Sequence, residues 1–378
     1  MHSFSRLVCT LSIFTLFACN GELGFEKRTK SGGGSAEAAS AQIEFDTENC
    51  TTRQWWNNKF TARLNLQMIS PASEALPQDY AVRYSFDHAA AVAEGLSKAD
   101  GSDVKLVYRD KDCSFQEVGY ALHPHTTWNS QSTEIWFRLL RPTAASSIEK
   151  RYYLYFGDPN ASNSALSFDE MTDYYENFNN APSENYFSEF ASTENAQYID
   201  GQLVLSGTTT QETRFALHGL IWSGESMPAG YIVESTMSVE TPGSDVWRAM
   251  IGVTASVVAI NRRQLQYYIP PAERADPAVA WTILSDTFLE TADFERQRFE
   301  VNVQPNETEV RLNGLVVGKR LLNVNEFMPQ IAYSPNVADV SFMVKYDHLI
   351  VRKAIASDAE IKIGSEPIET FENFEKTF

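Results

Sequence analysis

Short runs of alternating apolar and polar residues fill the chain from about residue 45 onward, and they limit its fold more than any other feature. The segments 60–66 (FTARLNL) and 298–303 (RFEVNV) place an apolar side chain at every second position, as a strand with one buried face requires. Turn pairs such as Asn313-Gly314 separate such runs about every 8 to 12 positions. Because amphipathic helical stretches are almost absent, the sequence predicts an all-β fold, and its length favours two β-sandwich domains in tandem.

The N-terminal segment has the pattern of a bacterial lipoprotein signal. An apolar run of about 12 residues, 7–18, is too short to span a bilayer and ends in Leu16-Phe17-Ala18-Cys19, which is similar to the lipoprotein cleavage site. Cleavage before Cys19 would leave its thiol for a diacylglycerol anchor, so we expect lipidation there and attachment to the cell envelope. Asn20 follows the cysteine, which favours the outer membrane. An ordinary secretory signal that ends near a cysteine is the alternative.

These features divide the chain into five expected parts. Residues 1–18 are the signal peptide, 19–44 a flexible polar tether, 45–165 and 166–367 the two sandwiches, and 368–378 a C-terminal tail. At about 5 to 6 Å times the square root of its length, such a tether would hold the sandwiches about 25 to 30 Å from the lipid.

The charge of the chain limits the classes of partner that it can bind, and its cysteine content indicates the compartment in which it works. The formal net charge of −18 argues against nucleic acid or an anionic lipid surface as a partner. Cys9 leaves with the signal and Cys19 takes the lipid, so that Cys50 and Cys113 remain. In an oxidising envelope this pair predicts a disulfide, and two buried thiols are the alternative.

The region of the first sandwich resembles a bacterial β-sandwich family called domain of unknown function 2341. The resemblance rests on Trp56, Asp100-Gly101-Ser102-Asp103, Trp128, Ile135-Trp136-Phe137 and the block 152–161 (YYLYFGDPNA). The second half is similar to a laminin-G or concanavalin-like jelly roll in the segments 176–178, 199–205, 346–353 and 364–367. Trp56 and Trp136 lie on apolar faces, which predicts core packing. Neither family has a settled activity, so the resemblance implies a fold and no function.

Sequence patterns of known catalytic sites are missing from the chain. Glycanases built on this jelly roll need paired carboxylates on one strand face, and the nearest string, 169–176, would scatter its carboxylates over both faces. No Gly-x-Ser-x-Gly, His-Glu-x-x-His or glycine-rich phosphate loop occurs either. His123 and His125 flank Pro124, and we expect two solvated imidazoles there rather than a shared metal. The sequence therefore predicts a protein that is not an enzyme.

The resemblance to the jelly roll implies one cofactor at most. Related jelly rolls often tie their first and last strands with calcium through an early acidic residue and a late aspartate, positions that Glu176 and Asp347 fill here. We therefore expect no cofactor other than a structural calcium ion. A plain hydrogen-bonding role for both carboxylates is the alternative.

One polar strand face in the second half is the candidate ligand site. Tyr268 alternates with Gln264 and Gln266 while apolar residues take the opposite face. An aromatic ring among amides suits a sugar, whose CH face stacks while its hydroxyls bond the amides. Arg248 and Asn302 would join this face if the sheet is concave. An ordinary solvated sheet face is the alternative.

These observations lead to three functional hypotheses in order of preference. The first is a non-catalytic, lipid-anchored module of the cell envelope that binds a polysaccharide or another envelope component. The second is a structural or adhesion lipoprotein that binds another protein. The third is a glycan-processing enzyme with an unrecognised site.

Overall fold

The structure is a computed structural model. It describes residues 54–373, except for 163–164, 182–186, 191–195, 209, 211–217, 223–225, 241–247, 254–255, 261–264, 269–280, 286–293, 322–323, 335–337, 340, 359–360 and 372. The expected signal peptide and tether, which includes Cys19, lie outside the described residues, and so does Cys50. Among the described residues, no helix is long and apolar enough to cross a membrane.

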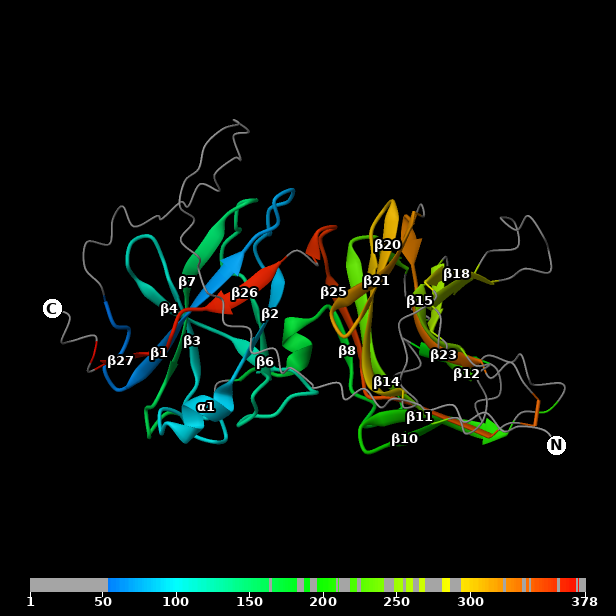
Figure 1. Ribbon diagram of the computed structural model, residues 1–378, viewed down its shortest axis with the longest axis horizontal. Coiled ribbons are helices and arrows are strands. Elements are labelled where there is room, and N and C mark those ends of the chain that lie inside the picture. The colour runs from blue at the N-terminus through cyan, green and yellow to red at the C-terminus, as the bar shows by residue number, and fades with distance from the viewer. Residues whose placement is uncertain are drawn as a thin grey trace, which may run out of the picture. The chain divides into compact units, whose positions relative to one another are not determined.

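The first sandwich packs a six-stranded sheet against a three-stranded one (Figure 1). The larger sheet has the order β26-β1-β7-β3-β4, with β27 also paired to β1. Its strands are β1 (Ala62–Ile69), β3 (Lys105–Arg109), β4 (Phe115–Val118), β7 (Ile148–Phe156), β26 (Lys362–Ser365) and β27 (Glu369–Thr370). The smaller sheet joins β2 (Ala81–Phe86), β6 (Thr133–Arg138) and β5 (Tyr120–Leu122), and the helix α1 (His88–Ala93) follows β2. Apolar side chains of both sheets, such as Leu64 and Ile135, form one buried core.

The second sandwich packs a nine-stranded sheet against a seven-stranded one. The larger sheet contains β8 (Tyr174–Glu176), β10 (Ala196–Ile199), β11 (Gln202–Thr208), β14 (Tyr231–Glu240), β19 (Phe294–Val303), β20 (Glu307–Leu312), β21 (Leu315–Leu321), β24 (Ser341–Tyr346) and β25 (Leu349–Lys353). The smaller sheet contains β9 (Phe187–Phe190), β12 (His218–Trp222), β15 (Arg248–Val253), β16 (Ser256–Ile260), β17 (Leu265–Tyr268), β18 (Trp281–Ser285) and β23 (Pro329–Ser334). Short elements are the 3-10 helix η1 (Phe168–Met171) and the pair β13 (Met227–Pro228) and β22 (Glu326–Phe327).

The predicted all-β class is confirmed, and the turn chemistry agrees with it. Asn313 and Gly314 both have positive φ, 50° and 81°, between the paired strands β20 and β21. Two residues with positive φ form the tight turn whose twist matches the twist of a hairpin.

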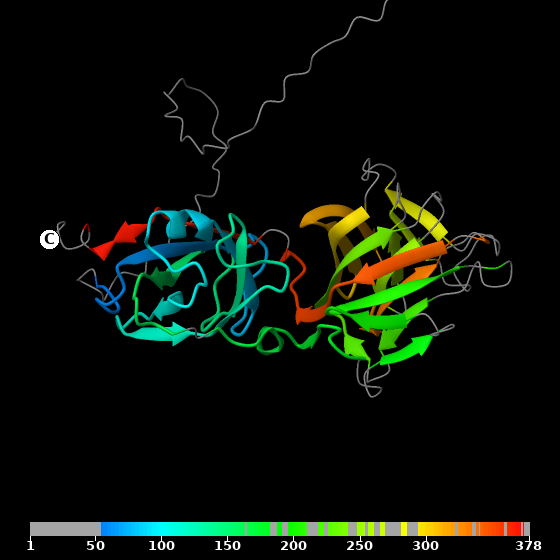
Figure 2. The same cartoon turned by 90° about the horizontal axis from the view of Figure 1, so that it is seen from below.

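The C-terminal strands return to the first sandwich. The sequence places residues up to 367 in the second sandwich and expects a tail after them, whereas β26 and β27 both pair with β1. Figures 1 and 2 show these red strands beside the blue β1. The physical reason is burial, because Ile361, Ile363 and Ile368 pack against the core of the first sandwich. The second sandwich is therefore inserted between strands of the first.

The face of β19 that alternation predicts to be solvated is buried. Phe299, Val301 and Val303 lie in the core of the second sandwich as expected, but Glu300 and Asn302 on the other face are only 0% and 1% exposed. Side chains of the first sandwich contact this face of the nine-stranded sheet, as the ion pair between Arg83 and Glu300 shows. We call the contact region between the two sandwiches the junction.

Trp136 belongs to the junction rather than to the core of the first sandwich. The residue is 1% exposed, so it is buried as expected, but not in the core of the first sandwich. Its neighbours, however, are Phe168, Met171 and Ile350, which form a separate apolar cluster. Ile350 lies in β25 of the second sandwich, so this cluster joins the two sandwiches. Trp56 is half-buried and stacks on Phe60 at the edge of the first sandwich.

Candidate functional site at the junction

Two buried carboxylates lie side by side on the junction face of the nine-stranded sheet. Glu234 in β14 is directly opposite Glu300 in β19 in the strand register. Val233 and Val301 point into the core of the second sandwich, so the two glutamates project from the other face. Both side chains are 0% exposed. Buried carboxylates need cations or hydrogen bonds, and the junction supplies them.

Arginines from both sandwiches neutralise this pair. Arg83 of β2 forms an ion pair with Glu300. The guanidinium of Arg298 lies with its Nε 2.9 Å from Glu234 Oε1 and its Nη2 3.0 Å from Glu300 Oε1. Its Nη1 lies 3.2 Å from Glu134 Oε2, and Glu134 also accepts a hydrogen bond from Trp136. A chain of alternating charges thus crosses the junction.

A second group of buried charges centres on Asp358, which follows β25. Arg352 places Nη1 3.0 Å from Asp358 Oδ1 and Nη2 3.2 Å from Oδ2. Arg311 of β20 places Nη1 2.6 Å from the same Oδ2. The hydroxyl of Tyr80, from the first sandwich, donates to Oδ1. Asp358 therefore holds side chains of both sandwiches.

The surroundings push the three carboxyl pKa values apart. Burial, and then repulsion by Glu300, raises the pKa of Glu234 to about 7. Burial also acts to raise the pKa of Glu300, but the positive charges of Arg83, Arg311 and Arg352 outweigh burial and lower it. Burial also acts to raise the pKa of Asp358, but the positive charges of Arg352 and Arg311 lower it far below its usual value. Asp358 and Glu300 are therefore ionised at neutral pH.

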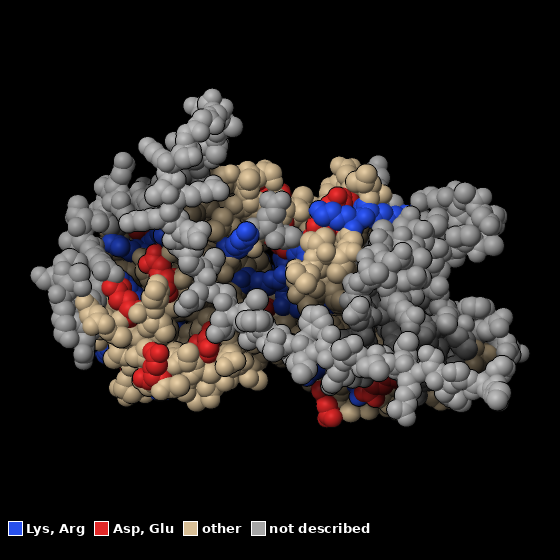
Figure 3. Space-filling view, viewed as in Figure 1, with Lys and Arg blue, Asp and Glu red and all other residues tan. Residues whose placement is uncertain are grey.

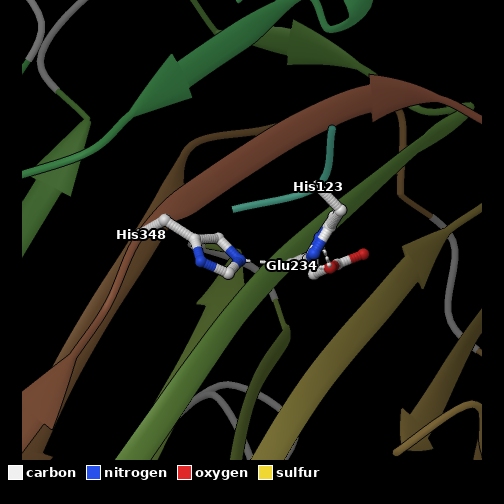
Figure 4. Close-up of side chains that lie close together, drawn as sticks. All are labelled: His123, Glu234 and His348. Carbon is white, nitrogen blue, oxygen red and sulfur yellow. Dashed lines mark hydrogen bonds and ion pairs between the residues drawn. The ribbon is translucent and has the colours of Figure 1, made fainter. Parts of the chain in front are cut away.

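Histidines border the buried pair on one side. His123 follows β5 in the first sandwich and lies with Nε2 3.3 Å from Glu234 Oε1, while His348 precedes β25 and lies with Nε2 4.0 Å from the same oxygen. Figure 4 shows both imidazoles beside the Glu234 carboxylate. His348 is 0% exposed, and burial lowers its pKa well below the usual value.

The expectation of two solvated imidazoles at His123 and His125 was wrong. His123 is 1% exposed and has an acidic partner, Glu234, that lies far away in the sequence. His125 is half-buried and packs against His348 with ring centroids 4.3 Å apart. Burial and the neighbouring His123 lower the pKa of His125 to about 3. The loop between β5 and β6 is covered because it contacts the second sandwich.

A cleft of about 310 Å³ lies beside the buried charges. Side chains of both sandwiches and of the C-terminal segment border it. They are Tyr80, Ala81, Val82, Arg83, Ser85, Glu134, Arg311, Gly314, Arg352, Asp358, Ile361 and Ile363. Figure 3 shows Lys and Arg side chains at the surface in the middle of the face that it presents. Charged and hydroxyl groups thus dominate the walls.

Glu176 and Asp347, the expected calcium ligands, are both engaged by protein groups. Glu176 in β8 accepts hydrogen bonds from the Tyr174 hydroxyl and the Phe178 backbone N–H. Asp347 accepts a hydrogen bond from Gln202 and lies near His125 and Arg296. Within the described part of the chain, neither belongs to a cluster of three potential metal ligands. A structural calcium ion at these two residues stays a prediction.

The structure divides the expected sugar-binding residues between two sheets. Arg248 in β15, and Gln266 and Tyr268 in β17, belong to the seven-stranded sheet, whereas Asn302 in β19 belongs to the nine-stranded one. Asn302 is buried in the junction, where its amide donates to the Ile355 carbonyl at 3.2 Å. Asn302 therefore does not share a face with the strand β17.

Several other expected site residues fall outside the described part of the structure. Gln264 lies there as a whole, and so do the side chains of Arg248, Gln266 and Tyr268. Cys113 follows Asp110 in a turn with φ of 69°, but Cys50 is not among the described residues, so their disulfide stays a prediction.

Comparison with known proteins finds likeness only in structure. No family model and no curated protein matches the chain. A structure of endo-acting O-glycanases from prominent members of the human gut microbiota has 11% identity and a TM-score of 0.41, covering 49% of this chain and 100% of that one. The catalytic domain of a laminarinase from Thermotoga petrophila has 11% identity and a TM-score of 0.36, over 48% and 96% of the two chains. A lichenase from a mouse hindgut metagenome has 13% identity and a TM-score of 0.37, over 48% and 98%.

The expectation of a non-catalytic module that is not an enzyme was wrong. The finding against it is that the three solved structures named above are of O-glycanases, a laminarinase and a lichenase. At these identities and TM-scores, neither an activity nor a catalytic residue passes from those proteins to this chain. The resemblance to domain of unknown function 2341 gains no support from the family models and stays a prediction.

Proposed function

We propose that this chain is a glycan-processing enzyme that acts on a polysaccharide in the junction cleft. The observation that carries the proposal is the composition of the cleft walls, where Arg83, Glu134, Arg352 and Asp358 converge from both sandwiches. A pocket with converging charged groups and strongly shifted pKa values is the best candidate for an active site in a fold of unknown function. Guanidinium donors beside carboxylate acceptors suit the hydroxyl groups of a sugar.

Two carboxylates border the cleft and are the candidates for the reaction. Glycoside cleavage uses a pair of carboxyl groups, one to protonate the leaving oxygen and one that acts as a carboxylate. Asp358 suits the second role because Arg352 and Arg311 hold its pKa far below the usual value. Glu134 is the other carboxyl group in the wall, and Trp136 and Arg298 fix its position through hydrogen bonds. Since Asp358 takes the second role, Glu134 is the carboxyl group of the cleft wall that remains, and we assign proton transfer to it.

Release of reducing ends from a panel of purified polysaccharides tests the proposal. We expect Glu134→Gln to reduce the rate about 100-fold or more, because the amide cannot transfer a proton. Glu117→Gln is the matched control, since Glu117 is 40% exposed in its ion pair with Lys105 and lies outside the cleft. If folded wild-type protein releases no reducing ends from the panel, or if Glu134→Gln is as active as the control, the proposal fails.

We also infer that the chain works at the cell envelope, on a lipid anchor at Cys19. The support is the sequence pattern around Cys19 and the polar tether that follows it. Replacing Cys19 with serine should move the protein from the membrane fraction to the soluble fraction after cell lysis. Unchanged fractionation would refute the anchor and leave the proposal for the cleft untouched.

A further inference from the structure

We propose that His123, Glu234 and His348 bind a divalent transition-metal ion, with zinc the leading candidate, inside the junction. The three residues come from separate parts of the fold. His123 follows β5 of the first sandwich, Glu234 lies in β14 and His348 precedes β25 of the second. Figure 4 shows their side chains together. An ion at this point would link the two sandwiches.

The spacing of the ligand atoms suits an ion after small side-chain shifts. One nitrogen or oxygen from each residue lies within 4.8 Å of the others. Nε2 of His123 is 3.3 Å and Nε2 of His348 is 4.0 Å from the same oxygen, Oε1 of Glu234. Ligands held about 2.1 Å from a tetrahedral zinc ion lie about 3.4 Å from one another. The first distance already matches and the second exceeds it by little.

The imidazole of His348 supplies an independent reason for a bound ion. Its side chain is 0% exposed, and neither Nδ1 nor Nε2 has a hydrogen-bond partner among the described residues. A neutral imidazole carries one donor and one acceptor, and native proteins rarely bury both without partners. Coordination through Nε2 would satisfy one of these atoms. No hydrogen bond in the described structure gives this ring another role.

The chemistry of the donors selects the class of ion. Two imidazole nitrogens and one carboxylate oxygen are typical ligands of zinc and its transition-metal neighbours. Calcium and magnesium prefer sets made of oxygen, so they should not bind here. Nε of Arg298 also lies close to Glu234 Oε1, but it makes no hydrogen bond there. If an ion binds that oxygen, the guanidinium still has its ion pairs with Glu134 and Glu300.

Metal binding would change the tautomer of His123, which gives a specific signature. Nδ1 of His123 accepts a hydrogen bond from the His125 backbone N–H at 3.3 Å, so the proton of the neutral ring is on Nε2. An ion at Nε2 requires that proton to move to Nδ1 and the contact with His125 to open. The ring loses no net proton, and its two nitrogens exchange roles. The ¹⁵N shifts of the imidazole report this exchange directly.

Zinc titration of the full-length chain, stripped of metal with a chelator, tests the site. We expect about one zinc ion to remain bound per chain after desalting, as one three-residue site holds one ion. The ¹⁵N spectrum should show His123 changing from the Nε2–H to the Nδ1–H tautomer, and the melting temperature should rise. Calcium and magnesium at equal concentration should produce none of these changes.

Variants separate this site from adventitious binding. His348→Ala should weaken zinc binding about 100-fold or more, because even neighbours of metal ligands typically change affinity 10- to 100-fold. His88→Gln is the control, as His88 is also buried but hydrogen-bonds Ser97 and the Asn129 N–H away from the junction. It should retain zinc.

Either of two results would overturn the metal site. One is a wild-type protein that retains no zinc and keeps the Nε2–H tautomer. The other is equal zinc affinity in wild type and His348→Ala. If His348→Ala does not fold, the wild-type titration and spectrum decide alone. No polysaccharide enters these measurements, so the metal site and the glycan-processing proposal can each fail without the other.

Discussion

Removing one negative charge at Asp358 should destabilise the whole junction. The carboxylate of Asp358 accepts hydrogen bonds from both Nη atoms of Arg352 and from one Nη atom of Arg311, and all three side chains are buried. Asp358→Asn keeps the shape of the side chain but replaces one oxygen with an amide NH₂. That NH₂ group would face the guanidinium donors of Arg352 and Arg311, and it cannot accept hydrogen bonds from them.

The expected loss follows from the number of hydrogen bonds at one oxygen. Oδ2 accepts hydrogen bonds from Arg352 at 3.2 Å and from Arg311 at 2.6 Å, and both bonds are lost when an amide NH₂ replaces this oxygen. At about 1.5 to 3 kcal/mol for each hydrogen bond to a charged group, Asp358→Asn should cost about 3 to 6 kcal/mol of unfolding free energy. A similar loss, about 3 to 5 kcal/mol, is typical when a buried ion pair loses one partner.

Urea unfolding followed by tryptophan fluorescence measures this loss as a lower midpoint. Glu117→Gln removes a carboxylate from the more exposed pair with Lys105 and should cost about 0 to 1 kcal/mol. Adding Arg352→Met to Asp358→Asn should recover part of the loss, because it removes one buried cation that has lost its counter-charge. If Asp358→Asn and Glu117→Gln shift the midpoint equally, the reasoning about buried charges is refuted.

Three further predictions concern pH, packing and redox state. Because the folded pKa of Asp358 is depressed, its stabilisation is complete above the unfolded pKa of about 3.9 and is lost progressively as the pH falls from there toward the folded pKa. Wild type should therefore lose more stability between about pH 5 and pH 3 than Asp358→Asn, and parallel curves would contradict this. Trp136→Ala should cost about 3 to 5 kcal/mol in the same unfolding assay, because the side chain is 1% exposed between the sandwiches; a change below about 1 kcal/mol would argue against this packing. Intact mass after alkylation without reduction should show Cys50 and Cys113 unmodified, and two alkylated thiols would exclude their disulfide.

Alternation along the chain predicts which residues enter a core but not what covers the opposite face. In β1, Ala62, Leu64 and Leu66 are buried as the period of two requires. Arg63, on the face predicted to be solvated, is only 5% exposed because Glu369 of β27 and Tyr155 contact it. A period of two indicates only which side chains of a strand face the core. It does not indicate whether a strand from a distant part of the sequence, such as β27, covers the opposite face.

The candidate site was missed for the same reason. His123 has no acidic neighbour in the sequence, and its partner Glu234 is 111 positions away. Glu234 and Glu300 occupy the polar positions of alternating strands, where a solvated glutamate is the ordinary expectation. Only the packing of one sandwich on the other turns these positions into a buried site. The one available signal was the pair of histidines around Pro124.

The return of β26 to β1 has a consequence for how the protein is made. Gln67 and Glu366 hydrogen-bond across 299 positions, so the first sheet cannot be completed until the chain has been synthesised past Glu366. Until then β1 has an open edge, which favours pairing with other chains, and contacts of such long separation form slowly. Truncation before Lys362 should therefore destabilise the first sandwich, and such variants should aggregate more readily than variants truncated after Thr370.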